Sequence, residues 1–260
     1  MEVVIVADAE AAGTLAAGIV ERLLTGKSDS VIGVATGSSP IITYRRLVEA
    51  FDAGRISFAD AHAVLLDEYV GLAADHPQRY RRFVHGHLVD HVDLRADHVH
   101  APDVDADDLA SAGPRYEALL TQLGGVDVQL LGIGTDGHVG FNEPGSSLRS
   151  RTRIKTLTAA TLADNARFFD HPDLVPRHVM TQGLATIGDA RHLVLVACGT
   201  AKAAPVAAAV EGPLTASCPA SILQWHPHVT VVIDEGAASG LVHSAYYRET
   251  HAGKPSWQHY

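Results

Sequence analysis

The feature that most constrains this sequence is an alternation, from end to end, of short β-branched runs with longer segments of helical period. Residues 3–6 form the first apolar run and predict a strand, and the Ala- and Leu-rich residues 9–24 predict the following helix, capped by Asp8. Such alternation is typical of parallel strands joined by helical crossovers. We therefore expect an α/β protein with a Rossmann-like three-layer sandwich, in which a mainly parallel sheet carries helices on both faces.

The remaining elements follow the same pattern, with turn residues between them. Ser39 is expected to cap a helix whose first residue is Pro40, because serine accepts hydrogen bonds from free amides at a helix start. We expect one domain over residues 1–260, ending in a loosely held tail at residues 251–260. Further strands are predicted at residues 30–35, 61–66, 127–133, 192–197 and 229–233. Further helices are predicted at residues 41–51, 77–90, 105–123, 159–169 and 201–210.

The composition sets limits on partners and location. Hydrophobic residues make up 47% of the 260 positions and charged residues 19%, a balance that supports a substantial buried core. The net charge of −10 disfavours nucleic acid and anionic membranes as partners. We find no secretion signal and no apolar run near the roughly 20 residues that cross a bilayer. Because the two cysteines, Cys198 and Cys218, form no disulfide framework, we expect a cytoplasmic protein.

One stretch, residues 134–155, breaks the alternation. It is crowded with Gly, Asn, Pro and Ser, and it is too long for an ordinary connection, which predicts a functional loop. Within it, Asp136, His138 and Glu143 place an imidazole between two carboxylates that can fix its tautomer and raise its basicity. Such a group suits proton transfer near neutral pH. The alternative is a plain turn with the histidine facing water.

Two turns from strand to helix are candidate anion sites. Residues 36–39 (TGSS) offer hydroxyls and free amides at a helix start. They lack the Gly-Lys-Ser/Thr of a nucleotide-binding loop, so a monophosphate fits better than ATP. Thr200 and Lys202 occupy a similar turn and could form a second side of the same pocket. Plain helix capping and a solvated lysine are the alternatives.

Residues 67–69 (DEY) follow another apolar run, so their carboxylates either terminate a strand or lie at the floor of the crevice. In sheets of this class the ligand binds beyond the carboxyl ends of the strands, where such loops converge. We therefore expect residues 67–72 to form a loop beside the loops that begin at residues 36 and 134, with residues 198–202 as a fourth.

Two other readings of the sequence are disfavoured. Gly132, Gly134 and Gly137 match the dinucleotide fingerprint, but the following residues 141–145 (FNEPG) cannot continue the helix that the motif requires. The histidine pairs 85/87, 98/100 and 226/228 share a face only in an extended segment, and no third ligand stands out. We therefore expect neither a nicotinamide or flavin site nor a metal site.

Taken together, these segments resemble glucosamine-6-phosphate deaminases, of the family that also contains the 6-phosphogluconolactonases. The resemblance runs in order from the first strand to about Glu235. Its most specific parts, DEYVGL and GHVGFNEP, separate the deaminases from the lactonases, which typically continue into Ser-Leu-Phe-Pro. Gly140 stands where we would expect alanine. The matching stretches are residues 35–40 (ATGSSP), 67–72 (DEYVGL), 132–147 (GIGTDGHVGFNEPGSS) and 151–156 (RTRIKT).

This resemblance implies conversion of glucosamine 6-phosphate and water into fructose 6-phosphate and ammonia, a hydrolytic deamination coupled to isomerisation in amino-sugar catabolism. It implies no metal and no organic cofactor. His138, oriented by Asp136 and Glu143, would open the sugar ring, and Asp67 would carry the proton between C2 and C1. A lid at about residues 150–180 would exclude water. The residues that would hold the substrate phosphate are Gly37, Ser38, Ser39, Arg167 and Lys202.

The resemblance also bears on regulation. Ser146, Arg153 and Lys155 match residues that, in some family members, hold the phosphate of the activator N-acetylglucosamine 6-phosphate between the subunits of a hexamer. It therefore implies an allosteric homohexamer that serves N-acetylglucosamine utilisation. Three alternatives stay open. They are a 6-phosphogluconolactonase, which Glu143 and Pro144 disfavour; a deaminase for the galactosamine epimer, which would keep every catalytic residue; and a non-enzymatic sugar-phosphate sensor.

Overall fold

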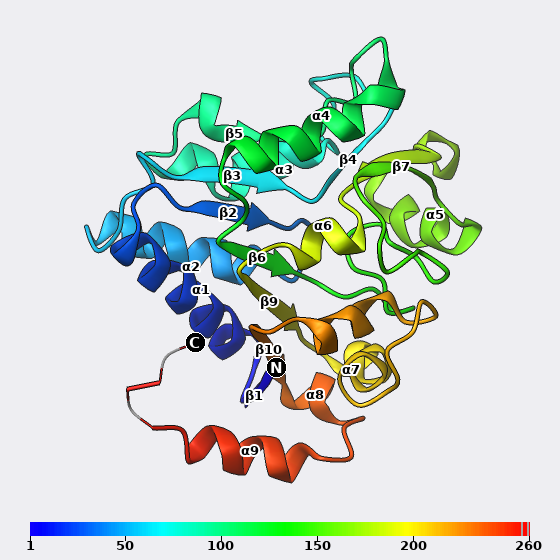
Figure 1. The fold of residues 1–260 in the computed structure, drawn as a ribbon. Coiled ribbons are helices and arrows are strands. Elements are labelled where there is room, and N and C mark those ends of the chain that lie inside the picture. The colour runs from blue at the N-terminus through cyan, green and yellow to red at the C-terminus, as the bar shows by residue number, and fades with distance from the viewer. Residues whose placement is uncertain (256, 259) are drawn as a thin grey trace.

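A seven-stranded sheet in which every pair of neighbours is parallel forms the centre of the molecule (Figure 1). The computed structural model describes residues 1–255, 257, 258 and 260, apart from the side chains of residues 160 and 164. The strand order is β1-β10-β9-β6-β2-β3-β5. The strands are β1 (Glu2–Val6), β2 (Val31–Val34), β3 (His62–Leu65), β5 (Val99–His100), β6 (Val128–Leu131), β9 (His192–Ala197) and β10 (Val229–Asp234).

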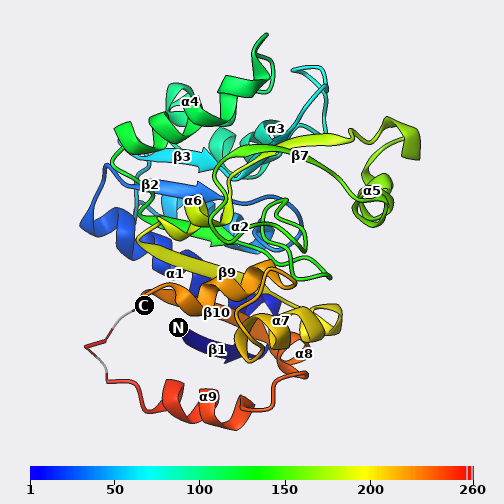
Figure 2. The same ribbon diagram turned by 45° about the vertical axis from the view of Figure 1, so that its right-hand side comes forward.

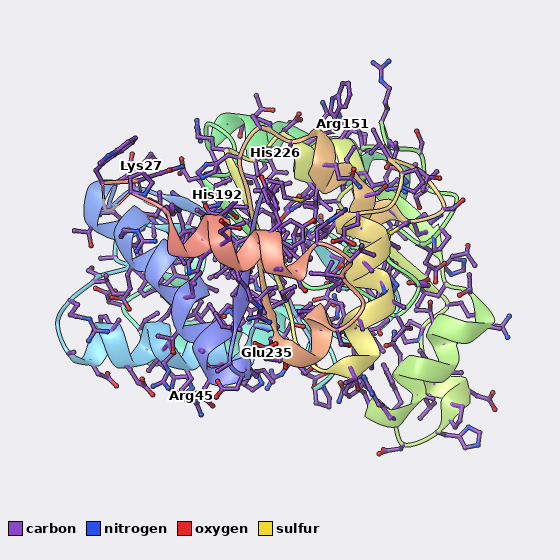
Figure 3. All side chains as sticks on the ribbon, turned by 90° about the horizontal axis from the view of Figure 1, so that it is seen from below. Lys27, Arg45, Arg151, His192, His226 and Glu235 are labelled. Atoms are coloured by element: carbon purple, nitrogen blue, oxygen red, sulfur yellow. The ribbon has the colours of Figure 1, made fainter. Side chains whose placement is uncertain are left out.

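The route of the chain places helices on both faces of this sheet. The chain runs from β1 through β2 and β3 to the β5 edge, then returns through β6 and β9 to β10. Because crossovers between parallel strands are right-handed, helices of the outward half cover one face and those of the return half cover the other. Figure 3 shows the blue helices α1 and α2 on the side opposite the green α4. The predicted three-layer α/β class is therefore confirmed.

The helices match the predicted positions with shifts at their ends. The α-helices are α1 (Ala9–Gly26), α2 (Ile41–Asp52), α3 (Tyr80–His87), α4 (Leu109–Gln122), α5 (Ala159–Asn165), α6 (Leu184–Gly188), α7 (Ala203–Val210), α8 (Glu235–Ala238) and α9 (Ser244–Ala252). Short 3-10 helices are η1 (Val89–His91), η2 (Ala96–His98), η3 (Ala166–Phe168), η4 (Pro172–Leu174), η5 (Thr200–Lys202) and η6 (Pro219–Trp225). The sequence did not predict α6, α8 or α9.

One predicted helix cap is confirmed and one is wrong. The Asp8 side chain accepts a hydrogen bond from the Ala11 amide at 2.8 Å, as expected at the start of α1. At the start of α2, Pro40 occupies the cap position itself and Ser39 lies one residue earlier, so no side chain caps this helix. Instead, the buried Tyr44 hydroxyl bonds both backbone groups of Ala35, which ties the preceding loop to α2.

A second, antiparallel sheet was not predicted. It has the order β4-β8-β7 and comprises β4 (Asp67–Tyr69), β7 (Arg153–Thr156) and β8 (His178–Thr181). Residues 67–69 therefore belong to a strand rather than a loop, and the predicted loop at 134–155 ends inside β7. Strands of three or four residues are too short to show a strand period. Figure 2 shows β7 and α5 on the side toward which the arrowheads of the central strands point.

The C-terminal segment packs against the first strand. Helix α9 contacts β1 at the edge of the central sheet. Beyond α9, the Lys254 ammonium donates a hydrogen bond to the Glu2 carboxylate at 2.8 Å and lies 3.6 Å from the centre of the Tyr260 ring. Residues 256 and 259 of the predicted tail lie outside the described residues. Nowhere in the described ranges is a helix both long and apolar enough to cross a membrane.

A stacked histidine pair at the amino ends of the central strands makes stability depend on pH. His192 is buried, bonds Thr230 at 2.9 Å and stacks on His228 with 3.6 Å between ring centres. Burial, followed by the neighbouring histidines, lowers the pKa of His192 to about 3. The unfolded chain therefore binds a proton at His192 near the ordinary pKa of about 6.5, whereas the folded protein does not. The contribution of His192 to the free energy of unfolding is present above about pH 6.5 and is lost as the pH drops toward 3.

We predict that the titration of His192 alone lowers the free energy of unfolding by about 2 kcal/mol when the pH falls from 6.5 to 5. Urea unfolding of the wild type and of His192→Phe at both pH values measures it, because the variant lacks this titration while other groups titrate in both proteins. An equal loss of stability in both would contradict the prediction.

Candidate active site

Three of the predicted loops meet where the chain reverses its direction across the sheet. The neighbouring strands β2 and β6 send their connections to opposite faces, and in sheets of this class ligands bind beyond the carboxyl ends of strands at such a reversal. A methyl group at Gly132, after β6, would lie 3.3 Å from the Ser39 hydroxyl of the loop after β2. From the loop after β9, the Lys202 ammonium donates a hydrogen bond to the Ile133 carbonyl at 2.7 Å. Three loops thus converge at this point.

The catalytic candidate His138 is held by a tight loop. Its carbonyl accepts a hydrogen bond from the Gly134 amide at 2.9 Å, and Gly137 turns the chain between them with φ +84°. Its Nδ1 lies 2.6 Å from the Asp136 carboxylate, which also accepts from the His138 amide. This hydrogen bond, opposed by burial, lowers the pKa of Asp136. An Nδ1 that donates to a carboxylate leaves Nε2 as the proton acceptor of the ring.

The imidazole rests directly on Gly134. A Cβ atom at this position would lie 2.1 Å from a ring carbon of His138, which is far inside van der Waals contact. Gly134 is therefore required by the histidine and not by a positive φ. The dinucleotide pattern of glycines that the sequence displays here has this different physical cause.

Asp67 lies at the start of β4, on the wall of the crevice that faces the same loop. It pairs with Thr181 of β8, and a Cβ at Gly140 would lie 3.4 Å from its Oδ2 atom. The side chain is only 5% exposed. Burial, together with the charge of Glu68, raises the pKa of Asp67 to about 8. A carboxyl group of this kind can exchange a proton near neutral pH.

Glu143 is buried at the far end of the loop and has other partners. Its Oε1 accepts hydrogen bonds from the Thr158 amide at 3.3 Å, from the Thr158 hydroxyl at 3.0 Å and from the Thr161 hydroxyl. These residues begin α5, in the segment predicted to act as a lid. Across the described residues, no hydrogen bond joins Glu143 to His138. The structure thus pairs His138 with Asp136 and sets Glu143 against the base of the lid segment.

Four of the five candidate phosphate-binding residues lie at the converging loops, and the fifth, Arg167, lies on the predicted lid segment. Gly37, with φ +88°, and Ser38 are exposed at the turn after β2, and Ser39 beside them is half-buried. Lys202 on η5 donates its hydrogen bond to the Ile133 carbonyl at the start of the loop after β6. Arg167, by contrast, is exposed on η3, where its guanidinium lies 4.7 Å from the centre of the Phe168 ring.

The three candidate regulatory residues lie on and before β7. Arg153 and Lys155 are two residues apart on this strand and so share a face. The Arg153 guanidinium donates a hydrogen bond to the Asn142 side chain at 2.9 Å, and burial lowers the pKa of Arg153. Ser146 is buried, and its hydroxyl has no hydrogen-bond partner among the described residues.

The sequence missed several residues that position this site. Asn142 donates to the carbonyls of Val139 and Gln182 as well as accepting from Arg153, so it fixes the loop between His138 and Glu143. Thr158 and Thr161 hold Glu143, and the only sequence signal for them is a threonine before a helical segment. The histidine pairs carry no metal cluster: in the described part of the chain, no group of three or more His, Cys, Asp or Glu side chains could hold an ion.

Both cysteines are unpaired, Cys198 half-buried and Cys218 buried. Cys218 lies next to the catalytic loop, because its sulfur would be 2.8 Å from a Cβ atom at Gly137.

The site combines an Asp–His pair, a buried carboxyl group of raised pKa and an exposed turn at a helix start. These features are typical of α/β enzymes that change phosphorylated substrates by proton transfer. Residues 7–232 match the family model described as glucosamine-6-phosphate isomerases/6-phosphogluconolactonase. The chain belongs to this family.

The relatives cover the whole chain. It is 55% identical over 258 residues to the glucosamine-6-phosphate deaminase of Rhodococcus opacus, and 54% identical over 259 residues to that of Mycolicibacterium smegmatis, with 99% of each chain covered. A solved monomeric glucosamine-6-phosphate deaminase is 40% identical, with a TM-score of 0.90 over 92% of this chain and 100% of that chain. The 6-phosphogluconolactonase of Trypanosoma brucei, at 19% identity and TM-score 0.73 over 93% of this chain and 98% of that chain, shares the fold.

We predict that Gly134→Ala lowers turnover at least about tenfold, because the added methyl group displaces the imidazole from its place beside Asp136. Gly86→Ala is the matched control: Gly86 lies inside α3 with no atom within 4 Å of its would-be Cβ. Steady-state rates of the two variants and the wild type measure the loss of turnover, and circular dichroism confirms that each protein is folded. Full activity in Gly134→Ala would show that the ring does not need this position.

Proposed function

We propose that this enzyme converts glucosamine 6-phosphate and water into fructose 6-phosphate and ammonia. The observation that carries the proposal is that one loop after β6 holds the Asp136–His138 pair, contacts the buried Asp67 of β4 at Gly140 and begins beside Ser39 at Gly132. The relatives that match the whole chain at 52–55% identity carry the name of this activity. No step requires a metal or an organic cofactor.

Ring opening is the first step that these residues can perform. The substrate enters as a closed ring, so a base must take the proton of the anomeric hydroxyl while an acid protonates the ring oxygen. His138 can do both in turn, since Asp136 holds its Nδ1 proton and leaves Nε2 to receive and return the other. We further propose that Glu143 joins this pair when substrate is bound, after releasing Thr158 and Thr161.

Isomerisation is the second step. Opening of the ring places a carbonyl next to C2 and acidifies its hydrogen, and removal of this proton by Asp67 gives an enolamine. Return of the proton from Asp67 to C1 turns the enolamine into an iminium at C2. Water adds to this iminium and ammonia leaves, which gives the ketone of fructose 6-phosphate. Each positioned proton transfer contributes on the order of 10² to 10⁴ in rate. A carboxyl group whose pKa is raised to about 8 is a stronger base than an ordinary aspartate, which suits removal of a proton from carbon.

Phosphate binding is assigned to the exposed turn at Gly37, Ser38 and Ser39 together with Lys202. The turn presents amides and hydroxyls at a helix start, which favour an anion. We propose that Arg167 reaches the same phosphate when residues 150–180 close as a lid, because it is exposed on that segment and a closed lid excludes water from the reacting atoms.

The proposal extends to regulation by an activator that binds between subunits. Ser146, Arg153 and Lys155 would hold the phosphate of N-acetylglucosamine 6-phosphate in a cytoplasmic homohexamer that serves N-acetylglucosamine utilisation. The unsatisfied Ser146 hydroxyl and the two basic residues on one face of β7 support it. The solved relative that is monomeric supports the opposite arrangement. Light scattering, and rate curves with and without the acetylated sugar phosphate, distinguish the two: a monomer with unchanged hyperbolic kinetics would overturn this part alone.

The test of the reaction is ammonia release from glucosamine 6-phosphate, with galactosamine 6-phosphate and 6-phosphogluconolactone as parallel substrates. Ammonia from the glucosamine ester is the expected result. Turnover of another substrate instead would overturn the assignment, while no turnover of any would favour a sugar-phosphate sensor.

We predict that Asp67→Asn and His138→Gln each lower turnover by at least about a hundredfold without unfolding the protein, because each removes one positioned proton transfer. Single-turnover rates and thermal unfolding measure the two effects separately. Near-normal turnover in either variant would refute the role of that residue.

A further inference from the structure

A second buried carboxylate, Glu68, lies next to Asp67 in β4 and has an unusually complete set of donors. It is 1% exposed, and it accepts hydrogen bonds from the backbone amides of Tyr69 at 2.9 Å, Tyr80 at 3.0 Å and Arg81 at 3.0 Å. Tyr80 and Arg81 are the first two residues of α3, where the partial positive charge of the helix gathers. Donors of this kind stabilise the ionised form of a carboxyl group.

Asp67 has the opposite environment. Successive residues of a strand point to opposite faces, so Asp67 faces Gly140 and Thr181 while Glu68 faces α3. No hydrogen-bond donor is found at the Asp67 carboxyl group among the residues that the structure describes, although the side chain is 5% exposed. Two adjacent carboxyl groups thus differ sharply in how well each can carry a charge, which is the pattern that separates an acid from a base.

We propose that Glu68 is a positioning residue for the reaction: its three amide bonds fasten β4 to the start of α3, and its anionic charge behind the strand keeps Asp67 ready to accept a proton. This rests on the proposed deaminase function, in which Asp67 takes the proton from C2 and returns it to C1. Asp67 gains a proton in the first transfer and loses it in the second, so a pKa close to the operating pH serves both.

The other titratable and charged groups nearby do not replace Glu68 in this role. Burial raises the pKa of Tyr69 to about 12 and raises those of Tyr80 and Tyr116 further, so all three are neutral beside Asp67. The charge of Arg79, before α3, also acts on Glu68, but its guanidinium is engaged by Asp105 and by the Leu72 and Ala73 carbonyls.

The different hydrogen-bond donors of Asp67 and Glu68 determine which of the two carboxyl groups ionises first. Burial raises the pKa of Glu68 as it raises that of Asp67, but the three amides and Arg79 oppose this only for Glu68. Glu68 therefore ionises first, and its charge then disfavours ionisation of Asp67. Removing that charge lowers the pKa of Asp67, so activity that requires ionised Asp67 should rise at a lower pH than in the wild type.

The experiment compares Glu68→Gln with the wild type and with Glu117→Gln. The control removes another internally bonded carboxylate, which accepts from the Thr152 amide and from the Thr186 hydroxyl and is not among the groups that act on Asp67. The pH profile of kcat/KM for ammonia release is recorded for all three. We expect the acidic limb of Glu68→Gln to move to lower pH by about one unit or more, with an unmoved limb in the control. An unmoved limb in Glu68→Gln would overturn the proposal.

A direct titration makes the test independent of activity. Carbon-13 NMR of aspartate-labelled protein follows the Asp67 carboxyl group, whose resonance is assigned by its loss in Asp67→Asn. The proposal requires that Asp67 titrates well above the ordinary range in the wild type and nearer to it in Glu68→Gln. An ordinary Asp67 titration in the wild type overturns the proposal, even if Glu68→Gln fails to fold.

Glu68→Asp serves as the charge-conserving variant. It keeps the anion but shortens its reach to the amides of α3, so stability should fall while Asp67 keeps its high titration point. If Asp67 in this variant shifts as in Glu68→Gln, the charge is not the cause. If the wild type releases no ammonia, the proposed function fails, and the carbon-13 titration still decides the role of Glu68.

Discussion

The reversal of chain direction between β2 and β6 is the constraint on which the rest of this site depends. Parallel neighbours whose crossovers leave for opposite faces cannot cover the gap between their carboxyl ends, so a crevice remains open there. The Ser39 turn and the loop that starts at Gly132 border this crevice because of that topology, although 92 residues separate them. Specific side chains are then added where the backbone route has already brought these loops together.

The small antiparallel sheet adds to the site three parts that do not come from the central sheet. Asp67 is fixed by pairing with Thr181, and the same β8 strand pairs with β7, which carries Arg153 and leads into the lid segment. The proposed proton carrier Asp67, the proposed lid and the candidate regulatory arginine thus rest on one three-stranded unit. Asn142 bonds Arg153 on one side and the catalytic loop on the other, so a change at β7 has a short physical route to His138.

The strands of the central sheet other than β5 could be predicted from sequence because they read as apolar runs, as at residues 192–197. Strand β5 could not, because it is only two residues long. The small sheet could not, because β4 is three residues long and two of them are acidic. The Asp136–His138 contact followed from its two-residue spacing. The partners of Glu143 did not, because Thr158 and Thr161 come near it only through tertiary folding. Glu68 was visible beside Asp67, but its three amide donors lie 1, 12 and 13 positions away.

The edge position of β1 has a consequence for how the chain is made. Strand β1 leaves the ribosome before its neighbour in the sheet, β10, which is encoded more than 220 residues later. At ordinary rates of synthesis the interval is roughly ten seconds to most of a minute. During that time the apolar residues of β1, together with the α1 face that will cover the sheet, have no finished surface to join. The edge of the sheet at β1 can therefore be completed only after residues 229–234 emerge.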